Sequence, residues 1–158
     1  MREEVKSARI ENLKSFFDEW DINHFGPKET CQLSHPDWPF DRLFPPPERM
    51  HENLRKTIIL ADEIRSDLGA PIKCISGYRP NAYNELIKGS PSSQHLSFYA
   101  LDLKPIYHSQ FNEFVQVAEK KVEESRSFGN IVGRGLYDTF IHIDTQFYSH
   151  QRNWDQRS

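Results

Sequence analysis

The sequence of 158 residues has only two cysteines, and it has no apolar run near the roughly 20 residues that a membrane-spanning helix needs. These two, Cys31 and Cys74, can form at most one disulfide, so a disulfide-rich fold is excluded. We expect two reduced, partly buried thiols, with a single disulfide between them as the alternative. The opening MREEVKSARIENLKSFF lacks the apolar segment and cleavage site of a secretory signal. We therefore expect a soluble chain made in the cytoplasm, which acts at a cell wall only if another factor releases it.

An excess of positive charge is also missing. The 20 Lys and Arg residues are outnumbered by 23 Asp and Glu residues, and the basic residues are scattered along the chain. This argues against a nucleic-acid-binding surface. Aromatic residues make up 13% of the chain, so Phe, Tyr and Trp must supply much of the core. The length predicts a single domain over residues 1–158, with a helical extension at 1–23.

Hydrophobic spacing and turn residues divide the chain into short elements. Helices are predicted over 3–20, 50–68, 81–88 and 111–122, strands over 72–76 and 100–104, and two further strands within 130–147. Six of the ten prolines fall between positions 27 and 47, where they predict an ordered loop. This order has too few β-α-β alternations for a doubly wound sheet. We predict an α+β fold with a small, mostly antiparallel sheet of about four strands backed by helices.

Three residues are candidate metal ligands. His95 and Asp102 are seven positions apart, so a straight helix or strand would separate them by roughly 10 to 24 Å, and the chain must turn between them to share one ion. The turn-rich segment GSPSS before His95 allows this, and an adjacent strand would bring His142 beside Asp102. Two imidazoles and one carboxylate form the ligand set of several catalytic zinc sites. On spacing alone, solvated surface residues would explain the same pattern.

The surrounding sequence resembles the zinc D-alanyl-D-alanine carboxypeptidases, a family that shares its fold with the hedgehog signalling domain and with phage peptidoglycan endopeptidases. The likeness extends over about residues 24–154 and is carried by SGYR at 76–79, by the spacing of Ser93, His95, Ala100 and Asp102, and by FIHIDT at 140–145. The resemblance implies a hedgehog/D-Ala-D-Ala peptidase-like fold and a zinc ion held by His95, Asp102 and His142. It also implies hydrolysis of a peptide bond.

The resemblance implies further roles around the metal. Arg79, in SGYR, would bind negative charge on the reacting peptide or a substrate carboxylate, for which a guanidinium fork is well suited. Ser93 would hydrogen-bond the substrate or brace the ligand loop, and Tyr78 would line the pocket or pack in the core. Chemistry alone leaves a surface salt bridge for Arg79 and an ordinary turn residue for Ser93 as alternatives.

The chain departs from the family pattern at two positions. Many members carry a glutamate base three residues before the last zinc histidine, where this chain has Thr139, which cannot take the proton. Asp144 is then the candidate general base, or alternatively the acceptor that orients His142. Phe98 stands where the family has glycine, which requires either an ordinary backbone conformation or a reshaped pocket.

We therefore expect a zinc metallopeptidase that cuts peptidoglycan stem peptides next to a D-amino acid. It would act as a carboxypeptidase or an endopeptidase, for example as a phage lysin or a cytosolic dipeptidase. The alternative is a catalytically inactive peptidase-like module that binds zinc or peptide in a virion or envelope assembly, which Thr139 and Phe98 favour. Hedgehog-like signalling is disfavoured, because the sequence shows no secretion signal or processing domain. Another divalent ion could replace zinc.

Overall fold

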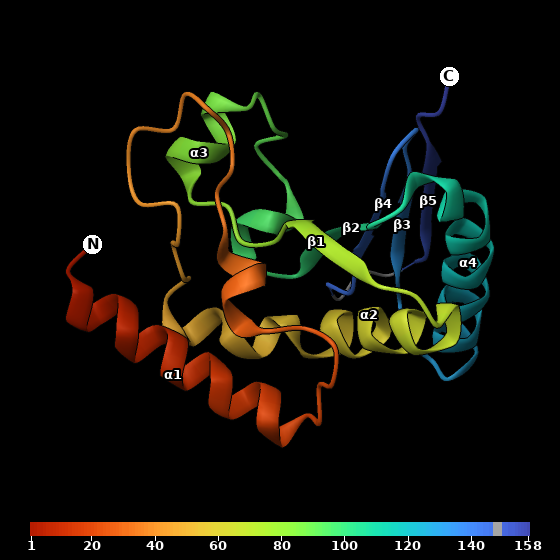
Figure 1. Cartoon of the computed structure of the whole chain (residues 1–158), viewed down its shortest axis with the longest axis horizontal. Coiled ribbons are helices and arrows are strands. Elements are labelled where there is room, and N and C mark those ends of the chain that lie inside the picture. Colours follow the sequence, from red (N-terminus) through yellow and green to blue (C-terminus); the bar gives the residue numbers. More distant parts are fainter. Residues whose placement is uncertain (147–149) are drawn as a thin grey trace.

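The computed structural model describes residues 1–146 and 150–158, and it confirms the predicted α+β fold (Figure 1). The α-helices are α1 (Glu3–Glu19), α2 (Arg55–Leu68), α3 (Asn81–Leu86) and α4 (Phe111–Ser127). The strands are β1 (Ile72–Ser76), β2 (Ala100–Pro105), β3 (Gly133–Leu136), β4 (Ile141–Asp144) and β5 (Arg152–Asp155). The short 3-10 helices are η1 (Pro27–Cys31), η2 (Glu48–Leu54), η3 (Gln94–Ser97) and η4 (His108–Gln110). Phe147, the last residue of the segment predicted to hold two strands, lies outside the described residues.

The five strands form one mixed sheet in the order β1-β2-β4-β3-β5. The first three pairings are antiparallel, as predicted, but β5 pairs with β3 in parallel. The expectation of about four strands therefore missed β5. This strand has four residues, RNWD, of which only Trp154 is apolar, so no alternating apolar pattern marks it in the sequence.

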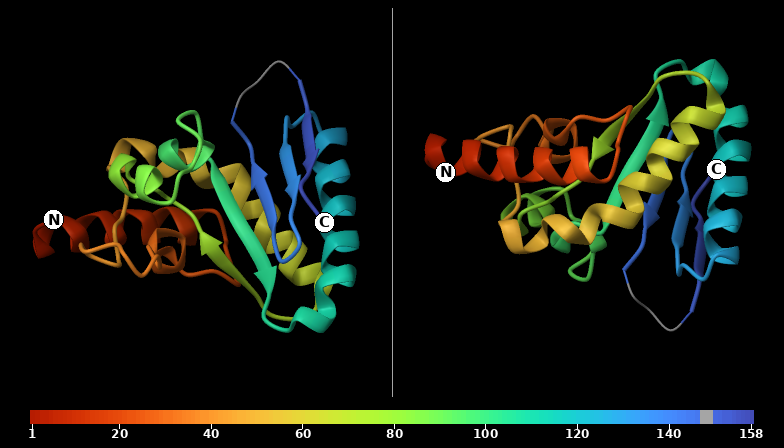
Figure 2. Two further views of the ribbon diagram at one scale, coloured as in Figure 1. Left: turned by 90° about the horizontal axis from the view of Figure 1, so that it is seen from above. Right: turned by 90° about the horizontal axis from the view of Figure 1, so that it is seen from below.

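The two faces of the sheet have different compositions. Leu101 and Leu103 of β2 and Ile141 and Ile143 of β4 are buried in the main hydrophobic core. Helices α2 and α4 contribute the other side of this core, and Figure 2 shows them running along the sheet. Because side chains alternate along a strand, the residues between these aliphatic positions point to the opposite face. That opposite face carries the polar residues of β2 and β4.

The predicted helical patterns are confirmed in α4 and over residues 55–68 in α2, whereas the first residues of the helix predicted over 50–68 lie in the 3-10 helix η2. The α2 helix buries Ile58, Ala61 and Ile64 and ends at Gly69, whose φ of +67° is the left-handed conformation that glycine adopts at a helix end. In the described part of the chain, no helix combines the length and apolar character needed to cross a membrane.

The segment after α1 covers the edge of the sheet that is formed by β1. In η1, the Glu29 carboxylate accepts a hydrogen bond from the backbone N–H of Cys74 in β1, at 3.2 Å. The Thr30 carbonyl accepts the N–H of Tyr78 just beyond β1, at 2.9 Å. A Cβ atom at Gly77 would lie 2.1 Å from the Thr30 carbonyl oxygen, so only glycine permits this close approach. The segment therefore occupies backbone groups that an edge strand would otherwise expose.

Both cysteines lie close to this edge. Cys31 ends η1 and Cys74 lies in β1, and both are buried and unbridged, as predicted. Burial raises the pKa of Cys31 to about 12 and raises that of Cys74 well above its ordinary value. Thiols in this state are unreactive.

Phe98 does not have the ordinary backbone conformation that was one of the two arrangements expected for it. Its φ of +64° lies in the left-handed region, so it keeps the backbone conformation that suits glycine. Its ring is fully buried and packs edge-on against Tyr78 at 6.1 Å and His51 at 6.5 Å between ring centroids. The left-handed conformation costs a non-glycine residue about 1–2 kcal/mol. Burial of the aromatic ring outweighs that cost.

Two substitutions at Phe98 separate the backbone effect from the packing effect. Phe98→Ala should lower the free energy of unfolding by about 3–5 kcal/mol, because it leaves a cavity. Phe98→Gly should be about 1 kcal/mol more stable than Phe98→Ala, because glycine removes the left-handed strain. Urea unfolding in the presence of a chelator measures both values without a contribution from metal binding. Equal stability of the two variants would contradict the strained backbone.

Candidate metal centre

The three predicted ligands meet at one place. Asp102 of β2 and His142 of β4 are directly paired across the antiparallel strands, and η3 brings His95 to the same position. One ligand atom from each residue lies within 4.8 Å of the other two. The Asp102 Oδ1 atom is 3.2 Å from Nε2 of His95 and 3.0 Å from Nδ1 of His142. Neighbouring ligand atoms of a tetrahedral zinc ion are about 3.3 Å apart, so this spacing fits a zinc ion.

The tautomer of His95 is fixed by the loop after β1. Nδ1 of His95 lies 2.7 Å from the Gly77 carbonyl oxygen, which can only accept, so Nδ1 carries the hydrogen. Burial lowers the pKa of His95, which favours the neutral imidazole with Nε2 as an acceptor. Nε2 lies 3.2 Å from the Asp102 carboxylate, and a cation between these two acceptors would satisfy both. The ligand atoms of this site therefore fit a bound metal ion.

The backbone on each side of His95 is also held. The N–H of Arg79 donates to the carbonyl of His95 at 3.1 Å, and the N–H of His95 donates to the Ser93 hydroxyl at 3.3 Å. Ser93 therefore braces the ligand loop, one of the two roles predicted for it. It also lines the cavity described below, so contact with a substrate stays a prediction.

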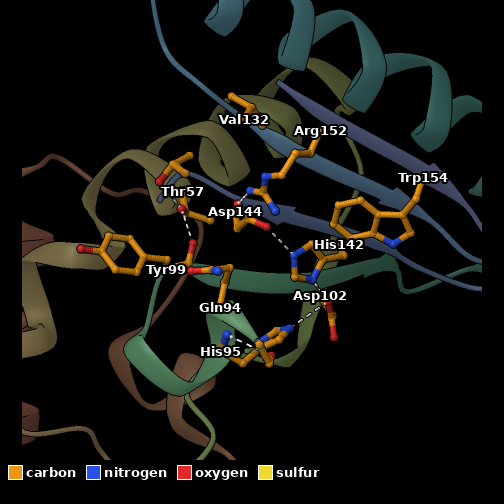
Figure 3. A network of polar contacts seen from close by, with 12 residues as sticks. Thr57, Gln94, His95, Tyr99, Asp102, Val132, His142, Asp144, Arg152 and Trp154 are labelled. Atoms are coloured by element: carbon orange, nitrogen blue, oxygen red, sulfur yellow. Dashed lines mark hydrogen bonds and ion pairs between the residues drawn. The ribbon is translucent and has the colours of Figure 1, made fainter. Parts of the chain in front are cut away.

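His142 lies between two carboxylates. Its Nε2 donates to Asp144 Oδ2 at 2.9 Å, while its Nδ1 faces Asp102. Burial disfavours the charged imidazolium, but the hydrogen bonds to Asp102 and Asp144 outweigh it and raise the pKa of His142 to about 9. Asp144 is fully buried and also pairs with the guanidinium of Arg152. Figure 3 shows Arg152, Asp144, His142, Asp102 and His95 following one another across the site.

Arg79 braces the second oxygen of Asp102. Its Nη2 donates to Asp102 Oδ2 at 3.2 Å, its Nε donates to Ser76 at 3.0 Å and its Nη1 donates to Asn84 at 3.4 Å. Burial raises the pKa of Asp102, but its close contacts with His95 and His142 outweigh this effect and hold the pKa well below its usual range. The carboxylate is therefore ionised and ready to bind a cation.

A cavity of about 490 Å³ opens onto the three ligands. Tyr137, Phe140 and Trp154 line it from the side of β3, β4 and β5. The other lining residues are Arg79, Ile87, Gly89, Ser90, Ser92, Ser93, Gln94, His95, Asp102, His142, Asp144 and Arg152. The cavity is thus lined by the three ligands, by an aromatic wall (Tyr137, Phe140 and Trp154) and by a serine-rich loop (Ser90, Ser92 and Ser93).

Two of the residues considered in the sequence do not reach this cavity. Among the described residues that line it, Tyr78 is missing, because its side chain is buried in the core against Phe98. Of the two roles considered for Tyr78, the structure supports packing rather than substrate binding. Thr139 is exposed in the turn between β3 and β4 and is also not among the described lining residues.

The sequence block RNW at 152–154 resembles the closing Arg and Trp of the family and predicts a packing role for Trp154, but it does not predict the ion pair between Arg152 and Asp144. Trp154 lies beside the His142 ring, at 5.1 Å between centroids, and its Nε1 donates to the Tyr137 hydroxyl at 3.0 Å. A detectable signal was the alternation of glycine in GRGL, since bare positions on one strand leave room for large side chains from the next strand.

Two imidazoles and one carboxylate beside an open cavity define the class of catalytic zinc sites that includes metallopeptidases. Comparison with known protein families shows which metallopeptidase family is present. The family model of Peptidase M15 matches residues 41–144, more than half of the chain. The chain belongs to the Peptidase M15 family, whose members are zinc-dependent. No curated protein and no solved structure shows a significant match. The resemblance seen at 24–40 and 145–154 lies outside the matched residues.

Zinc binding should depend on pH through His142. Since the pKa of His142 is raised to about 9, the metal must displace one proton from this residue at neutral pH. Zinc affinity should therefore rise about tenfold per pH unit between roughly pH 6 and 8, and level off above about 9. Calorimetry in buffers of different ionisation enthalpy should show about one proton released per zinc ion at pH 7. A pH-independent affinity over this range would contradict the assignment.

Proposed function

We propose that this zinc metallopeptidase hydrolyses peptidoglycan stem peptides at a bond next to a D-amino acid. The observation that carries the proposal is the convergence of His95, Asp102 and His142 in the lining of an open cavity. The sequence blocks that contain these residues resemble the D-alanyl-D-alanine carboxypeptidases. The SGYR block places Arg79 in the same cavity. The cavity size suits a short peptide segment.

The residues around the ligands have distinct proposed roles. When bound, zinc supplies Lewis-acid chemistry: it lowers the pKa of water and polarises a carbonyl group. Arg79 is held by Ser76, Asn84 and Asp102, and its place in the cavity wall lets its guanidinium stabilise negative charge on the reacting peptide. The serine-rich loop offers hydroxyl groups to a peptide backbone, and the aromatic wall supports its side chains.

The geometry of Asp144 favours the orienting role over the general-base role. One carboxylate oxygen accepts from Nε2 of His142, on the far side of the imidazole from Nδ1, and the other pairs with Arg152. A base must approach the proton that it takes to about 2.6–3.2 Å, so Asp144 would first have to leave both partners. We propose that Asp144 holds the imidazole so that Nδ1 faces the metal.

A second candidate function is a zinc-dependent peptide-binding module without turnover. It is favoured by the engagement of Asp144 and by the exposed Thr139 at the position of the family glutamate. Among the described residues that line the cavity, Asp102 and Asp144 are the only carboxylates.

Stereospecific cleavage tests the enzymatic proposal. A stem pentapeptide ending in D-Ala-D-Ala should be hydrolysed by the zinc-loaded protein, whereas the same peptide ending in L-Ala-L-Ala should not. Mass spectrometry of the products identifies the bond that is cut. An amidated carboxyl terminus should block cleavage by a carboxypeptidase but not by an endopeptidase.

Two histidine variants serve as controls for this assay. His142→Ala should abolish cleavage and zinc binding, whereas His108→Ala, which removes an exposed histidine outside the cavity lining, should leave both unchanged. Retained zinc binding without cleavage of the pentapeptide or of purified peptidoglycan would decide for the binding module.

Asp144→Asn separates the two roles of this carboxylate. If Asp144 orients His142, the variant should bind zinc about 10–100-fold more weakly, and kcat at saturating zinc should fall by less than about tenfold. A general base would show the opposite pattern, with unchanged zinc affinity and a kcat lowered by about 10²–10⁴-fold. Zinc competition with a chromophoric chelator and steady-state kinetics measure the two quantities.

A further inference from the structure

Two rows of residues cross the sheet on the polar face. In the first row, Asp144 of β4 is paired with Gly133 of β3, and Gly133 is paired with Arg152 of β5. In the second row, Gly135 lies in the same way between His142 and Trp154. The side chains of β5 therefore reach residues of β4 that are two strands away.

The glycines of β3 make this reach possible. A Cβ atom at Gly133 would lie 2.5 Å from the Arg152 guanidinium and 2.6 Å from the Asp144 carboxylate. A Cβ atom at Gly135 would lie 2.3 Å from the Trp154 indole. The space above β3 is thus filled by Arg152 and Trp154, and the first of these pairs with the carboxylate that holds His142.

Side chains from outside the sheet hold β5 in register. Arg126 of α4 donates to the carbonyl oxygens of Val132 and Arg152, at 2.8 and 3.2 Å, and to the Asn153 side chain at 2.8 Å. The N–H of Val132 donates to the side chain of Gln151 at 2.6 Å. The position of Arg152 is therefore set by the fold around it as well as by its ion pair with Asp144.

We propose that Arg152 is a positioning residue of the metal centre, which acts through Asp144 to hold the His142 imidazole with Nδ1 toward the metal. The proposal rests on the role of His142 as a metal ligand in the proposed function. It extends the functional unit beyond the family-matched residues 41–144 to the strand β5. An unpaired carboxylate could rotate away from Nε2, whereas a carboxylate held at both oxygens cannot. Arg152 accordingly acts on metal binding through its ion pair with Asp144.

A double-mutant cycle on zinc affinity tests this proposal. Arg152→Met should raise the zinc dissociation constant about tenfold, the lower end of the range for residues that support a metal ligand. In the Asp144→Asn background, the same substitution should change the constant by less than about twofold, because its route to His142 is already lost. The visible spectrum of bound Co²⁺ should shift on Arg152→Met, since a reoriented imidazole alters the ligand field. Arg152→Gln carries the same expectations if the methionine variant does not fold.

Arg134→Met is the matched control. Arg134 lies in β3 and forms an ion pair with Glu119 of α4 at 3.5 Å, so the variant removes an arginine of the same sheet without touching Asp144. Its zinc affinity and Co²⁺ spectrum should match those of the unmodified protein. Thermal unfolding with chelator shows how far each variant destabilises the fold.

Two outcomes would overturn the proposal. One is a zinc affinity of the Arg152 variant within twofold of the unmodified protein. The other is an equal loss in the presence and absence of Asp144→Asn, which would show that Arg152 acts on the fold in general. If zinc affinity does not depend on His142, the proposed metal site itself fails. If it depends on His142 but not on Arg152, only the present inference fails.

Discussion

The metal centre depends on which nitrogen of each imidazole faces the ion. A histidine binds a metal only through a nitrogen that carries no hydrogen, so its other nitrogen needs an acceptor. The carbonyl of Gly77 provides this acceptor for His95, and the carboxylate of Asp144 provides it for His142. The two histidines consequently present different atoms, Nε2 and Nδ1, toward Asp102.

The sheet holds the ligands Asp102 and His142 in fixed positions. Asp102 and His142 belong to the central strands β2 and β4, and their immediate neighbours in sequence point into the core below. Leu101 and Ile143 are fully buried, so a rotation of either strand that displaced a ligand would also expose aliphatic surface to water. The core contacts of β2 and β4 therefore also hold their polar side chains in place, because core-facing and polar residues alternate along both strands.

Only the local part of this arrangement, the individual strands, could be predicted from the sequence pattern. Alternation around Asp102 and His142 predicted both strands, and family resemblance predicted that their side chains meet. Pairing with β5 was not visible, because a four-residue strand without apolar alternation gains its stability from partners distant in the chain. The conformation of Phe98 was hidden for a related reason: local preference disfavours it, and only tertiary packing of the ring reverses that preference.

The glycines of β3 couple the side-chain sizes that are allowed on β3 to those that are allowed on β5. Positions 133 and 152 compete for one volume, and positions 135 and 154 compete for another. A methyl group gained at position 135 has to be matched by a smaller side chain at position 154, whereas one gained at position 133 would meet the Asp144 carboxylate as well as Arg152. Accepted substitutions in relatives of this protein should accordingly come in compensating pairs, large facing small, at positions 135 and 154, while position 133 should stay glycine wherever Asp144 is kept.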